Sequence, residues 1–360
     1  MRVLHITARA DFGGGPEHVF LQVMEQIKRD GIECFVACPD DYPYNARYSE
    51  LVGNSKVTQL PHRAFSIVSI INILRFIRRH KIQILHSHGK GAGIYGRLLS
   101  FLSRTPSVHT FHGLHVGEYN WLQKKIYIAI EKILGVLTKK VVCVSSGERE
   151  LILSHNLIAE KKLQLIDNGV FIPNYEFPAN HTGRLKVLSV SRFDEQKNPE
   201  LLLDISREIN ATNLRDKVQI IVIGEGEKFS SCRDIIDTEG LNGVICLHGT
   251  TTSPRQFMHE ADVFLSTSKW EGMPIAVLEA MSEGLPVVAT KVVGNIDVMS
   301  NHVEGVLFDL EDVKGAVNAI SAMLDDDFRG KCGRSAHATA TLKFSAEKMV
   351  THTLKVYSQV

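Results

Sequence analysis

The chain has 360 residues, 44% of them hydrophobic and 22% charged, and its formal net charge is +1. This composition is typical of a globular protein that is long enough for two domains. No run of about 18 apolar residues occurs, which excludes a helix that spans a membrane.

The N-terminus and the cysteines favour the cytoplasm. Met1–Ile6 leads straight into a strand-like run without a signal-peptide pattern. The six cysteines are scattered through apolar or helical context, which favours buried free thiols in a reducing compartment. Cys34 and Cys38 could form a metal pair, but zinc needs four converging ligands and no second pair lies nearby. We therefore expect no zinc site.

Strand-like and helical segments alternate along the first half. This alternation predicts βαβ units and a parallel sheet covered by helices on both faces. The expected strands are residues 2–8, 34–39, 82–88, 107–113, 141–145 and 163–170, and the expected helices are 19–31, 66–80, 93–103, 119–140 and 147–156.

The segment 171–183, "FIPNYEFPANHTG", interrupts the alternation with two prolines, two asparagines and a glycine, as a linker would. The alternation then restarts at residue 185. We expect two doubly wound, Rossmann-like domains at 1–172 and 173–345, with a C-terminal helix at 346–360 that packs back towards the first domain. Ligands of such sheets bind at the carboxyl ends of the strands, so a cleft between the domains is the expected site.

Three glycines follow the first strand in "FGGGPEH". Free amides and the helix dipole favour an anion there, which makes Gly14 and Gly15 candidates for phosphate contacts. The segment lacks the spacing of a dinucleotide fingerprint and the lysine of a P-loop, so a tight turn is the alternative.

Two cations follow the strand at 185–191. Arg192 and Lys197 in "SRFDEQKNP" can clamp a diphosphate, or they can form an ordinary solvated pair. After the next strand, Gly224 lets backbone approach a ligand or simply turns the chain. A dehydrogenase would carry an acid about 20 residues further on. That region ends instead in His248 and Gly249, which counts against a dehydrogenase.

The stretch "EGMPIAVLEAMSEGLPVVAT" places Glu271 in a loop before a short helix and Glu279 inside it. A loop carboxylate can accept hydrogen bonds from sugar hydroxyls, and a helix carboxylate can grip a ribose diol. The helix start at Met273, Pro274 and Ile275 is a candidate donor-binding segment, because the free N–H groups of the first turn suit a phosphate or hydroxyl oxygen. The alternative is an acid that pairs with the helix dipole plus a solvated helix acid. Glu283 at the helix end is expected to be solvated.

These motifs, in this order, resemble the retaining glycosyltransferases of the GT-B fold in the large family four, which is defined by an E-x(7)-E motif. Glu271 and Glu279 match that motif, and Arg192 and Lys197 match the family's diphosphate clamp. "FGGGPEH" resembles its glycine loop, and "HTFHG" its strand-end histidine, His112. "DNGV" at 167–170 and "ADVFLSTS" at 261–268 also fit.

The resemblance implies transfer of a hexose or N-acetylhexosamine from a nucleoside diphosphate sugar, UDP-linked by family frequency, with retention at the anomeric carbon. Glu279 would bind ribose, Glu271 the sugar hydroxyls, and Arg192 with Lys197 the leaving diphosphate. His112 would contact the donor sugar or its leaving phosphate. A front-face mechanism without a metal or other cofactor is expected, and no D-x-D motif occurs in the cleft segments.

Two departures from the family pattern follow the strand at 286–290. The usual Gly-Gly pair with a glutamate is replaced by "KVVGNIDV", with Gly294 and Asp297. The usual aspartate after "NGV" is Phe171. Contacts from the loop at Gly294 to the donor are therefore not implied.

The histidines and the basic helices of the first half suggest partners. His86, His88, His109, His112 and His115 end two strands without an accompanying acid, so they suit lining of the cleft better than a metal site.

Residues 1–180 have a net charge of +7 and the remainder −6. With Lys124, Lys125, Lys139 and Lys140 in a basic amphipathic helix, this favours peripheral binding to an anionic membrane, at the inner face of the cell membrane. The alternative is that the apolar side of the helix packs on the sheet. No nucleic-acid motif occurs.

The expected function is therefore assembly of a lipid-linked glycan or surface polysaccharide. The alternatives are a sugar-nucleotide epimerase of the same fold, a phosphorylase, which is usually a much longer chain, and a non-catalytic nucleotide-sugar-binding protein.

Overall fold

The computed structural model describes residues 1–11, 14–62, 64–113, 120–174 and 183–360. Two compact units make up the chain, and each is described by itself. Unit 1 comprises Met1–Gly169 and Ala346–Val360, and unit 2 comprises Val170–Ser345. The boundary expected at 172/173 lies shortly after this division. Most of the expected linker, residues 175–182, lies outside the described part.

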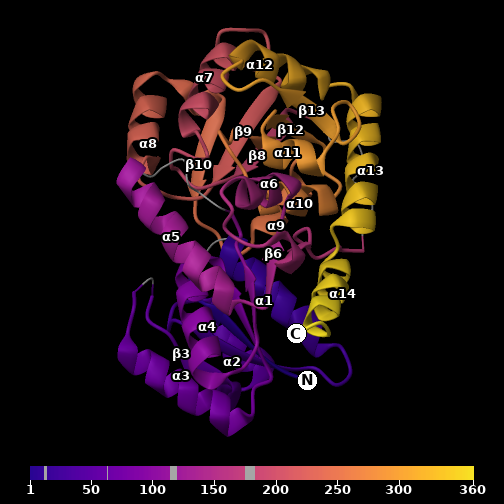
Figure 1. The fold of residues 1–360 in the computed structure, drawn as a ribbon. Helices are drawn as coiled ribbons and strands as arrows, with labels where there is room; N and C mark the ends of the chain where they lie inside the picture. Colours follow the sequence, from indigo (N-terminus) through magenta and orange to yellow (C-terminus); the bar gives the residue numbers. More distant parts are fainter. Residues whose placement is uncertain (12–13, 63, 114–119, 175–182) are drawn as a thin grey trace. The chain divides into compact units, whose positions relative to one another are not determined.

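Unit 1 is built on a seven-stranded parallel sheet with the strand order β3-β2-β1-β4-β5-β6-β7 (Figure 1). Parallel strands need crossover connections, which the helices supply. The strands are β1 (Arg2–Thr7), β2 (Glu33–Cys38), β3 (Val57–Gln59), β4 (Ile84–His88), β5 (Ser107–Thr110), β6 (Lys140–Cys143) and β7 (Leu163–Leu165). The helices are α1 (Gly14–Ile27), α2 (Tyr44–Val52), α3 (Ile67–His80), α4 (Gly89–Ser103), α5 (Trp121–Leu137), α6 (Ser146–Ser154) and α14 (Ala346–Tyr357), with short 3-10 turns at Asn54–Lys56 and Glu160–Lys162.

Unit 2 repeats this architecture with six parallel strands in the order β10-β9-β8-β11-β12-β13. The strands are β8 (Leu185–Val190), β9 (Val218–Ile223), β10 (Ile245–Gly249), β11 (Val263–Ser266), β12 (Val287–Thr290) and β13 (Gly305–Phe308). The helices are α7 (Pro199–Asn210), α8 (Phe229–Thr238), α9 (Pro254–Glu260), α10 (Ile275–Ser282), α11 (Val293–Val298), α12 (Val313–Ala322) and α13 (Asp326–Lys343), with a 3-10 turn at Leu241–Gly243.

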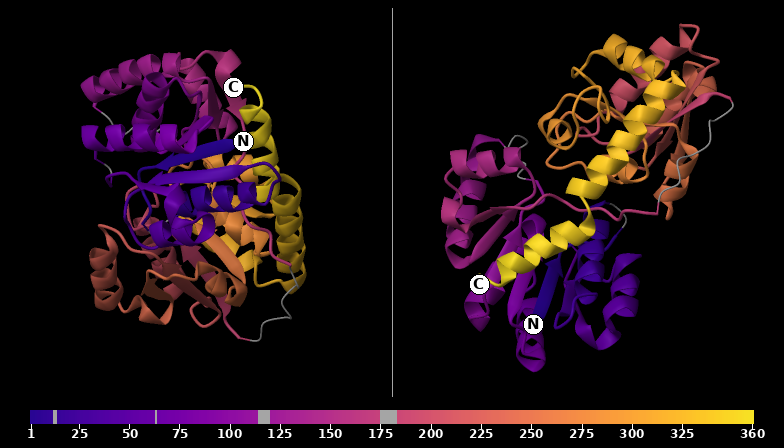
Figure 2. Two further views of the ribbon diagram at one scale, coloured as in Figure 1. Left: turned by 90° about the horizontal axis from the view of Figure 1, so that it is seen from below. Right: turned by 90° about the vertical axis from the view of Figure 1, so that its right-hand side faces the viewer.

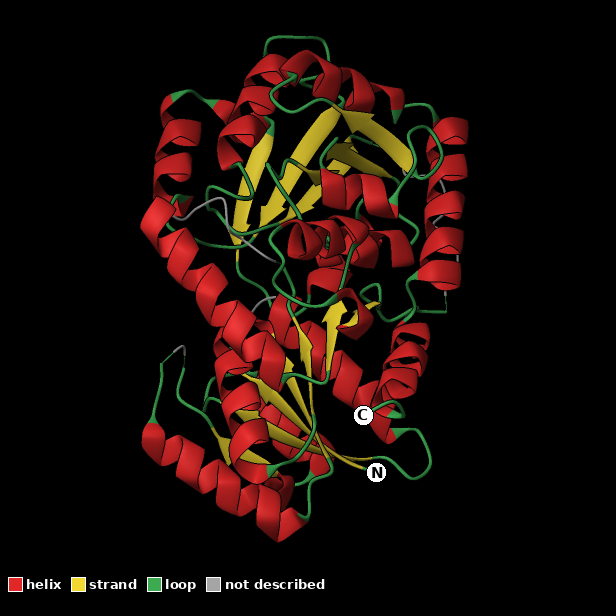
Figure 3. Cartoon of the chain, in the orientation of Figure 1, coloured by secondary structure: helices red, strands yellow, loops and turns green. Residues whose placement is uncertain are grey.

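Each sheet is sandwiched between helices (Figure 3), and its central strands are almost continuously buried, as parallel strands covered on both faces should be. In unit 1, α3 and α4 cover one face through Ile73 and Leu99, and α1 and α2 cover the other through Val23 and Tyr48. The largest cluster of unit 2 joins its sheet to α7, α8 and α12. Two doubly wound sheets confirm the predicted fold class.

The C-terminal helix α14 belongs to unit 1, where it lies beside α1 and the sheet (Figure 2). Its Met349, Val350 and Tyr357 pack on Val3 and Ile84 of the central strands. The last helix thus completes one face of the first sheet.

No helix among the described residues is long and apolar enough to cross a membrane.

Candidate functional site

Lys197 and Glu271 meet at the carboxyl edge of the unit 2 sheet. Lys197 lies in the loop after β8, and Glu271 lies between β11 and α10, so two adjacent parallel strands bring them together. The Lys197 ammonium is 2.5 Å from Glu271 Oε1, and these side chains are only 19% and 6% exposed. Ser268 Oγ also donates to Glu271 Oε1, at 2.6 Å. Gln196 Nε2 donates to the other oxygen, Oε2, at 3.5 Å, so three donors fix the carboxylate.

A small pocket opens beside this pair. Its lining includes Ser189, Ser191, Lys197, Ser266, Glu271 and Pro274. Hydroxyl groups, an ammonium and a carboxylate thus converge at strand ends, which is where ligands bind in doubly wound sheets. The arrangement suits a ligand that carries both negative charge and hydroxyl groups.

Arg192 lies in the same loop but points to other partners. Its side chain is 57% exposed, with Nη2 3.0 Å from Asp194 Oδ2 and 3.1 Å from Gln196 Oε1. Gln196 in turn donates to the carbonyl of Trp270, next to Glu271. An exposed guanidinium on a short loop is available to an incoming anion, because a surface ion pair is weakly held.

Gly224 and Gly294 shape the site through close backbone contacts. Gly224 has φ +136°, and a Cβ there would lie 2.0 Å from the Ser191 carbonyl oxygen. A Cβ at Gly294 in α11 would lie 2.5 Å from Glu271 Cβ. The two glycines therefore allow neighbouring loops to lie against Arg192 and Glu271. This close contact of Gly224 lies within the protein and does not decide between a ligand contact and a simple turn.

The start of α10 follows Glu271 directly. Met273 and Pro274 are buried, Ile275 begins the helix and Glu279 is partly exposed one turn further on. Pro274 is the N-cap of α10, and its side chain accepts no hydrogen bond. The first backbone N–H groups of α10 are therefore not capped by this side chain.

The expectation that Glu283 is solvated is wrong. Its side chain is 1% exposed and is paired with Arg255 at 2.7 Å. The sequence showed a carboxylate at a helix end but not the arginine on α9 that covers it.

In unit 1, the first turn of α1 contains Gly14 and Gly15, so the helix starts within the glycine run rather than after it. The neighbouring Phe12 and Gly13 lie outside the described residues, as does His115. A Cβ on Gly15 would meet nothing within 4 Å, so no neighbour requires a glycine there.

His112 follows β5 in a left-handed conformation, with φ +59°. Such a conformation is uncommon for a residue other than glycine and is held by its surroundings. The next amide, Gly113 N–H, donates to Glu148 Oε1 at 2.6 Å, and Val144 N–H donates to Glu148 Oε2 at 2.8 Å. Burial raises the pKa of Glu148 to about 7 despite these two bonds.

His86 and His109 are fully buried and do not line an open site. His86 bonds to Tyr357 and Thr110, and His109 Nδ1 is 2.9 Å from Ser87 Oγ. This corrects the expectation that these histidines face a ligand. They point into the sheet-helix layers because strand residues alternate between faces.

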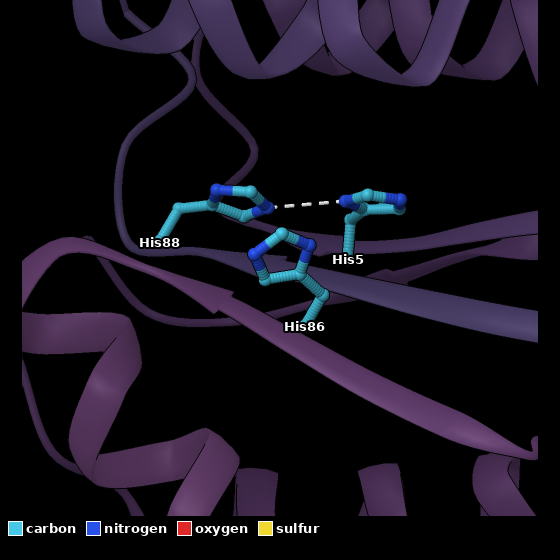
Figure 4. Close-up of side chains that lie close together, drawn as sticks. All are labelled: His5, His86 and His88. Carbon is cyan, nitrogen blue, oxygen red and sulfur yellow. Dashed lines mark hydrogen bonds between the residues drawn. The ribbon is translucent and has the colours of Figure 1, made fainter. Parts of the chain in front are cut away.

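His5, His86 and His88 form the one group of three possible metal ligands found among the described residues (Figure 4). Sequence reasoning missed His5 because its partners are 81 and 83 positions away in the chain, although they lie on the adjacent strand. It also missed Ser268 and Glu148, whose contacts with Glu271 and Gly113 depend on loop geometry.

Two doubly wound units, one with a cation and an acid at its strand ends, define a two-domain α/β protein that binds ligands at sheet edges. Two family models match the chain almost end to end. Residues 13–172 match the model described as Glycosyltransferase Family 4, and residues 172–339 match Glycosyl transferases group 1. The chain belongs to the family-four type of GT-B glycosyltransferases.

Known proteins agree with this assignment. The chain is 27% identical over 331 residues to an Escherichia coli UDP-Gal:alpha-D-GlcNAc-diphosphoundecaprenol alpha-1,3-galactosyltransferase, covering 87% of this chain and 85% of that one. It is 23% identical to the capsular polysaccharide biosynthesis glycosyltransferase CapM of Staphylococcus aureus, covering 78% and 77%.

Among solved structures, Anabaena Alr3699/HepE in complex with UDP and glucose superimposes with a TM-score of 0.84 at 18% identity over the whole of both chains. At that identity the likeness concerns the fold. The chain is thus a glycosyltransferase with the predicted GT-B architecture.

Proposed function

We propose that this glycosyltransferase moves a hexose or N-acetylhexosamine from a UDP-sugar to a lipid-linked or polysaccharide acceptor, with retention at the anomeric carbon and without a metal. The observation that carries the donor assignment is the Lys197–Glu271–Ser268 cluster at the strand ends of unit 2. The relative that acts on UDP-Gal and a diphosphoundecaprenol acceptor supports the substrate classes.

The charge of each site residue indicates its proposed role. Lys197 and Arg192 neutralise the diphosphate as it leaves, since positive charge placed where negative charge develops lowers the barrier. Glu271 accepts hydrogen bonds from the donor sugar, and Glu279 accepts those of the ribose. Gly14, Gly15, Gly224 and the start of α10 at Met273, Pro274 and Ile275 supply backbone groups to the donor. His112 contacts the sugar or its phosphate.

The proposed reaction is a front-face substitution. The bond between the anomeric carbon and the diphosphate oxygen breaks, and its electron pair stays on that oxygen. The acceptor hydroxyl forms its bond on the same face and gives its proton to the departing phosphate oxygen. Glu271 is engaged by Lys197 and Ser268, which makes it a poor nucleophile and favours this route over a covalent intermediate.

Donor hydrolysis tests this proposal without knowledge of the acceptor. UDP-glucose, UDP-galactose and UDP-N-acetylglucosamine are incubated with the protein in EDTA, and proton NMR follows the anomer released before it equilibrates. Slow release of the retained anomer from at least one donor is expected. Release of the inverted anomer refutes retention, and activity that requires added Mg²⁺ or Mn²⁺ refutes metal independence. The absence of any UDP-sugar binding or turnover refutes the function.

We also propose that α5 binds an anionic membrane surface peripherally. Its outward face carries apolar side chains that no packing covers, among them Ile126, Ile133 and Val136, with exposures of 52%, 66% and 76%. The alternative, in which the apolar stripe packs on the sheet, holds only for the opposite side of α5, where Tyr127 and Leu134 are buried. Lys125 stacks on the exposed Trp121 ring at 4.0 Å, so apolar and cationic groups adjoin.

Liposome flotation tests the membrane proposal. Vesicles of phosphatidylglycerol and phosphatidylcholine should carry the wild-type protein upward at low salt, and pure phosphatidylcholine should carry much less. Ile126→Ser with Ile133→Ser, or neutralisation of Lys124 and Lys125 on α5 together with Lys139 and Lys140, which the structure places beyond the end of the helix, should abolish flotation. Leu342→Ser, an equally exposed apolar site on α13, should not. Equal flotation of all variants would refute the role of α5.

A further inference from the structure

A line of hydrogen-bonded side chains runs through unit 1 and ends at His112. Gln26 Oε1 lies 3.0 Å from His5 Nε2, and His5 Nδ1 lies 3.0 Å from His88 Nε2. His88 Nδ1 then lies 3.2 Å from His112 Nε2. Gln26, His5 and His88 are buried, whereas His112 is partly exposed. The line therefore connects the interior to an imidazole that is only partly buried.

Gln26, the first residue of the line, determines which atom donates and which accepts in each hydrogen bond of the line. The amide oxygen of Gln26 only accepts, so His5 carries its proton on Nε2. A neutral imidazole has one N–H and one lone pair, so His5 Nδ1 must accept from His88 Nε2–H. By the same rule, His88 Nδ1 accepts from His112 Nε2–H. His112 is left with its lone pair on Nδ1.

We infer that Gln26, His5 and His88 hold His112 as the Nε2–H tautomer, so that its Nδ1 accepts a hydrogen bond from a hydroxyl of the donor sugar. This inference rests on the proposed function for its ligand but not for its tautomer. Gln26, His5 and His88 are positioning residues, because they act through His112.

Burial supports a line of neutral rings. Desolvation lowers the pKa of His5 to about 4, that of His112 to about 3 and that of His88 well below the ordinary value. None of these rings carries charge near neutral pH, so each has the one donor and one acceptor that the line requires.

The same contacts argue against a metal at His5, His86 and His88. Both nitrogens of His5 and of His88 belong to the line, and both nitrogens of His86 face hydroxyls, Tyr357 Oη at 2.5 Å and Thr110 Oγ1 at 2.8 Å. A metal would have to displace these bonds in a buried layer. Satisfied buried rings are stable without one.

The tautomer of His112 decides whether this residue contacts the donor sugar or its leaving phosphate. A lone pair on Nδ1 attracts a hydroxyl hydrogen but repels a phosphate oxygen, because an ionised phosphate only accepts hydrogen bonds. His112 therefore contacts the sugar rather than its leaving phosphate. A protonated or Nδ1–H imidazole would have favoured the phosphate.

The tautomer is measured in the free protein by nitrogen-15 NMR of histidine-labelled wild type. His112→Asn assigns the His112 signals, since asparagine tolerates a left-handed conformation. We expect a protonated Nε2 and an unprotonated Nδ1 at neutral pH. A protonated Nδ1, or signals shifted by bound zinc when Zn²⁺ is added, would overturn the inference.

A matched pair of variants tests the line itself. His88→Phe keeps a ring but deletes both nitrogens, and His86→Phe makes the same change in the adjacent ring, whose centroid is 4.1 Å away but whose bonds lie outside the line. His112 should populate both tautomers in His88→Phe and keep one in His86→Phe. Loss of the single tautomer in both, or in neither, would contradict the line. The wild-type spectrum decides the tautomer even if either variant fails to fold.

Calorimetry with UDP, UDP-glucose and UDP-galactose tests the ligand. In His88→Phe the affinity for the better UDP-sugar should fall about 2-fold, because about half of the His112 rings leave the binding-competent tautomer, and that for UDP should stay unchanged. An equal loss for UDP would place His112 on the phosphate and refute the assignment, as would an unchanged UDP-sugar affinity. If wild type binds neither ligand, the proposed function fails, whereas the tautomer result stands.

Discussion

Gly294 sets the position of Glu271 by having no side chain. An added Cβ would lie 2.5 Å from Glu271 Cβ and 3.0 Å from its carbonyl oxygen. Contacts this short cannot be accommodated without a shift of the loop. The glycine that remains in this departure from the family pattern thus gives Glu271 the space that it occupies.

Gly294→Ala should move Glu271 and weaken UDP-sugar binding by about tenfold, because small displacements in a binding site are costly. Gly243→Ala is the matched control, since a Cβ there meets nothing within 4 Å. Calorimetry with UDP-glucose or UDP-galactose measures the difference. Equal affinities for the two variants would show that the loop adapts.

Lys197→Met should lower donor turnover by at least about 100-fold, because a preorganised charge at the leaving group is typically worth that much. It should also destabilise unit 2, since Glu271 stays buried without its cation, at a cost of about 3 kcal/mol or more. Lys291→Ala, an exposed lysine of the same unit, is the control. Donor hydrolysis and thermal unfolding are the readouts. Full activity in Lys197→Met would remove Lys197 from the mechanism.

At the scale of single residues, the sequence predicted which residues occupy the site better than it predicted the contacts that they make. The loop positions of Lys197 and Glu271 followed from the strand pattern, whereas the ion pair that joins them was not predicted. Glu283 and His86 were misjudged because burial depends on what another element places over them. Arg255 and Tyr357 do so from distant parts of the chain.

At the scale of elements, α5 is joined to α4 by a buried ion pair. Arg97 Nη1 lies 2.7 Å from Glu131 Oε2, and the two side chains are 0% and 2% exposed. The same guanidinium lies over the Phe111 ring, next to His112. Buried charge that is satisfied only by its partner is strongly destabilising when that partner is removed.

Glu131→Gln and Arg97→Met should each destabilise unit 1 by about 3–5 kcal/mol. The double change Arg97→Met with Glu131→Leu should cost much less than the sum, because no uncompensated charge remains. Hydrogen exchange followed by mass spectrometry, on peptides from α4 and α5, measures the effect within one unit. Additive losses would mean that the pair is not coupled.

The long, strongly periodic elements were predictable, and so was the short α10, whereas several other short elements were not. The expected helices at 66–80 and 119–140 correspond to α3 and α5. The sequence interpretation missed α2, the three-residue β3 and the six-residue α11, because such lengths carry too little periodicity. It also placed the start of α1 too late, since three glycines suggested a turn.

For the molecule as a whole, buried histidines occur only in unit 1 within the described part of the chain. Burial lowers the pKa of His5 and His18 to about 4 and that of His112 to about 3. A base whose pKa is lowered by folding stabilises the folded state fully above its unfolded pKa of about 6.5. That contribution is lost as pH falls towards 4.

Unit 1 should therefore lose more stability than unit 2 between pH 6.5 and pH 4, by about 1.4 kcal/mol per pH unit for each such histidine. Glu148 opposes this in part, because its pKa of about 7 makes the folded state relatively more stable as pH falls from 7 to 4.5. Hydrogen exchange at pH 7 and pH 5, corrected for intrinsic rates, compares the units. Equal losses would refute the prediction.

The alternation of strands and helices was enough to predict two doubly wound sheets, and the family comparison confirms the GT-B architecture. The line from Gln26 to His112 was beyond sequence reasoning, because it joins residues from α1, β1, β4 and the end of β5. Only the register of adjacent strands, with His5 opposite His86, brings them together.

Because α14 closes one face of the unit 1 sheet and follows unit 2 in the chain, unit 1 cannot finish folding until all of unit 2 has been synthesised. Val3 and Ile84 are covered by Val350 and Tyr357. The apolar surfaces of Val3 and Ile84 therefore remain exposed until unit 2 has been translated and α14 follows. Unit 2 is contiguous and can mature first. The unit whose synthesis begins first is then completed last, and its uncovered apolar surface is prone to aggregation during that interval.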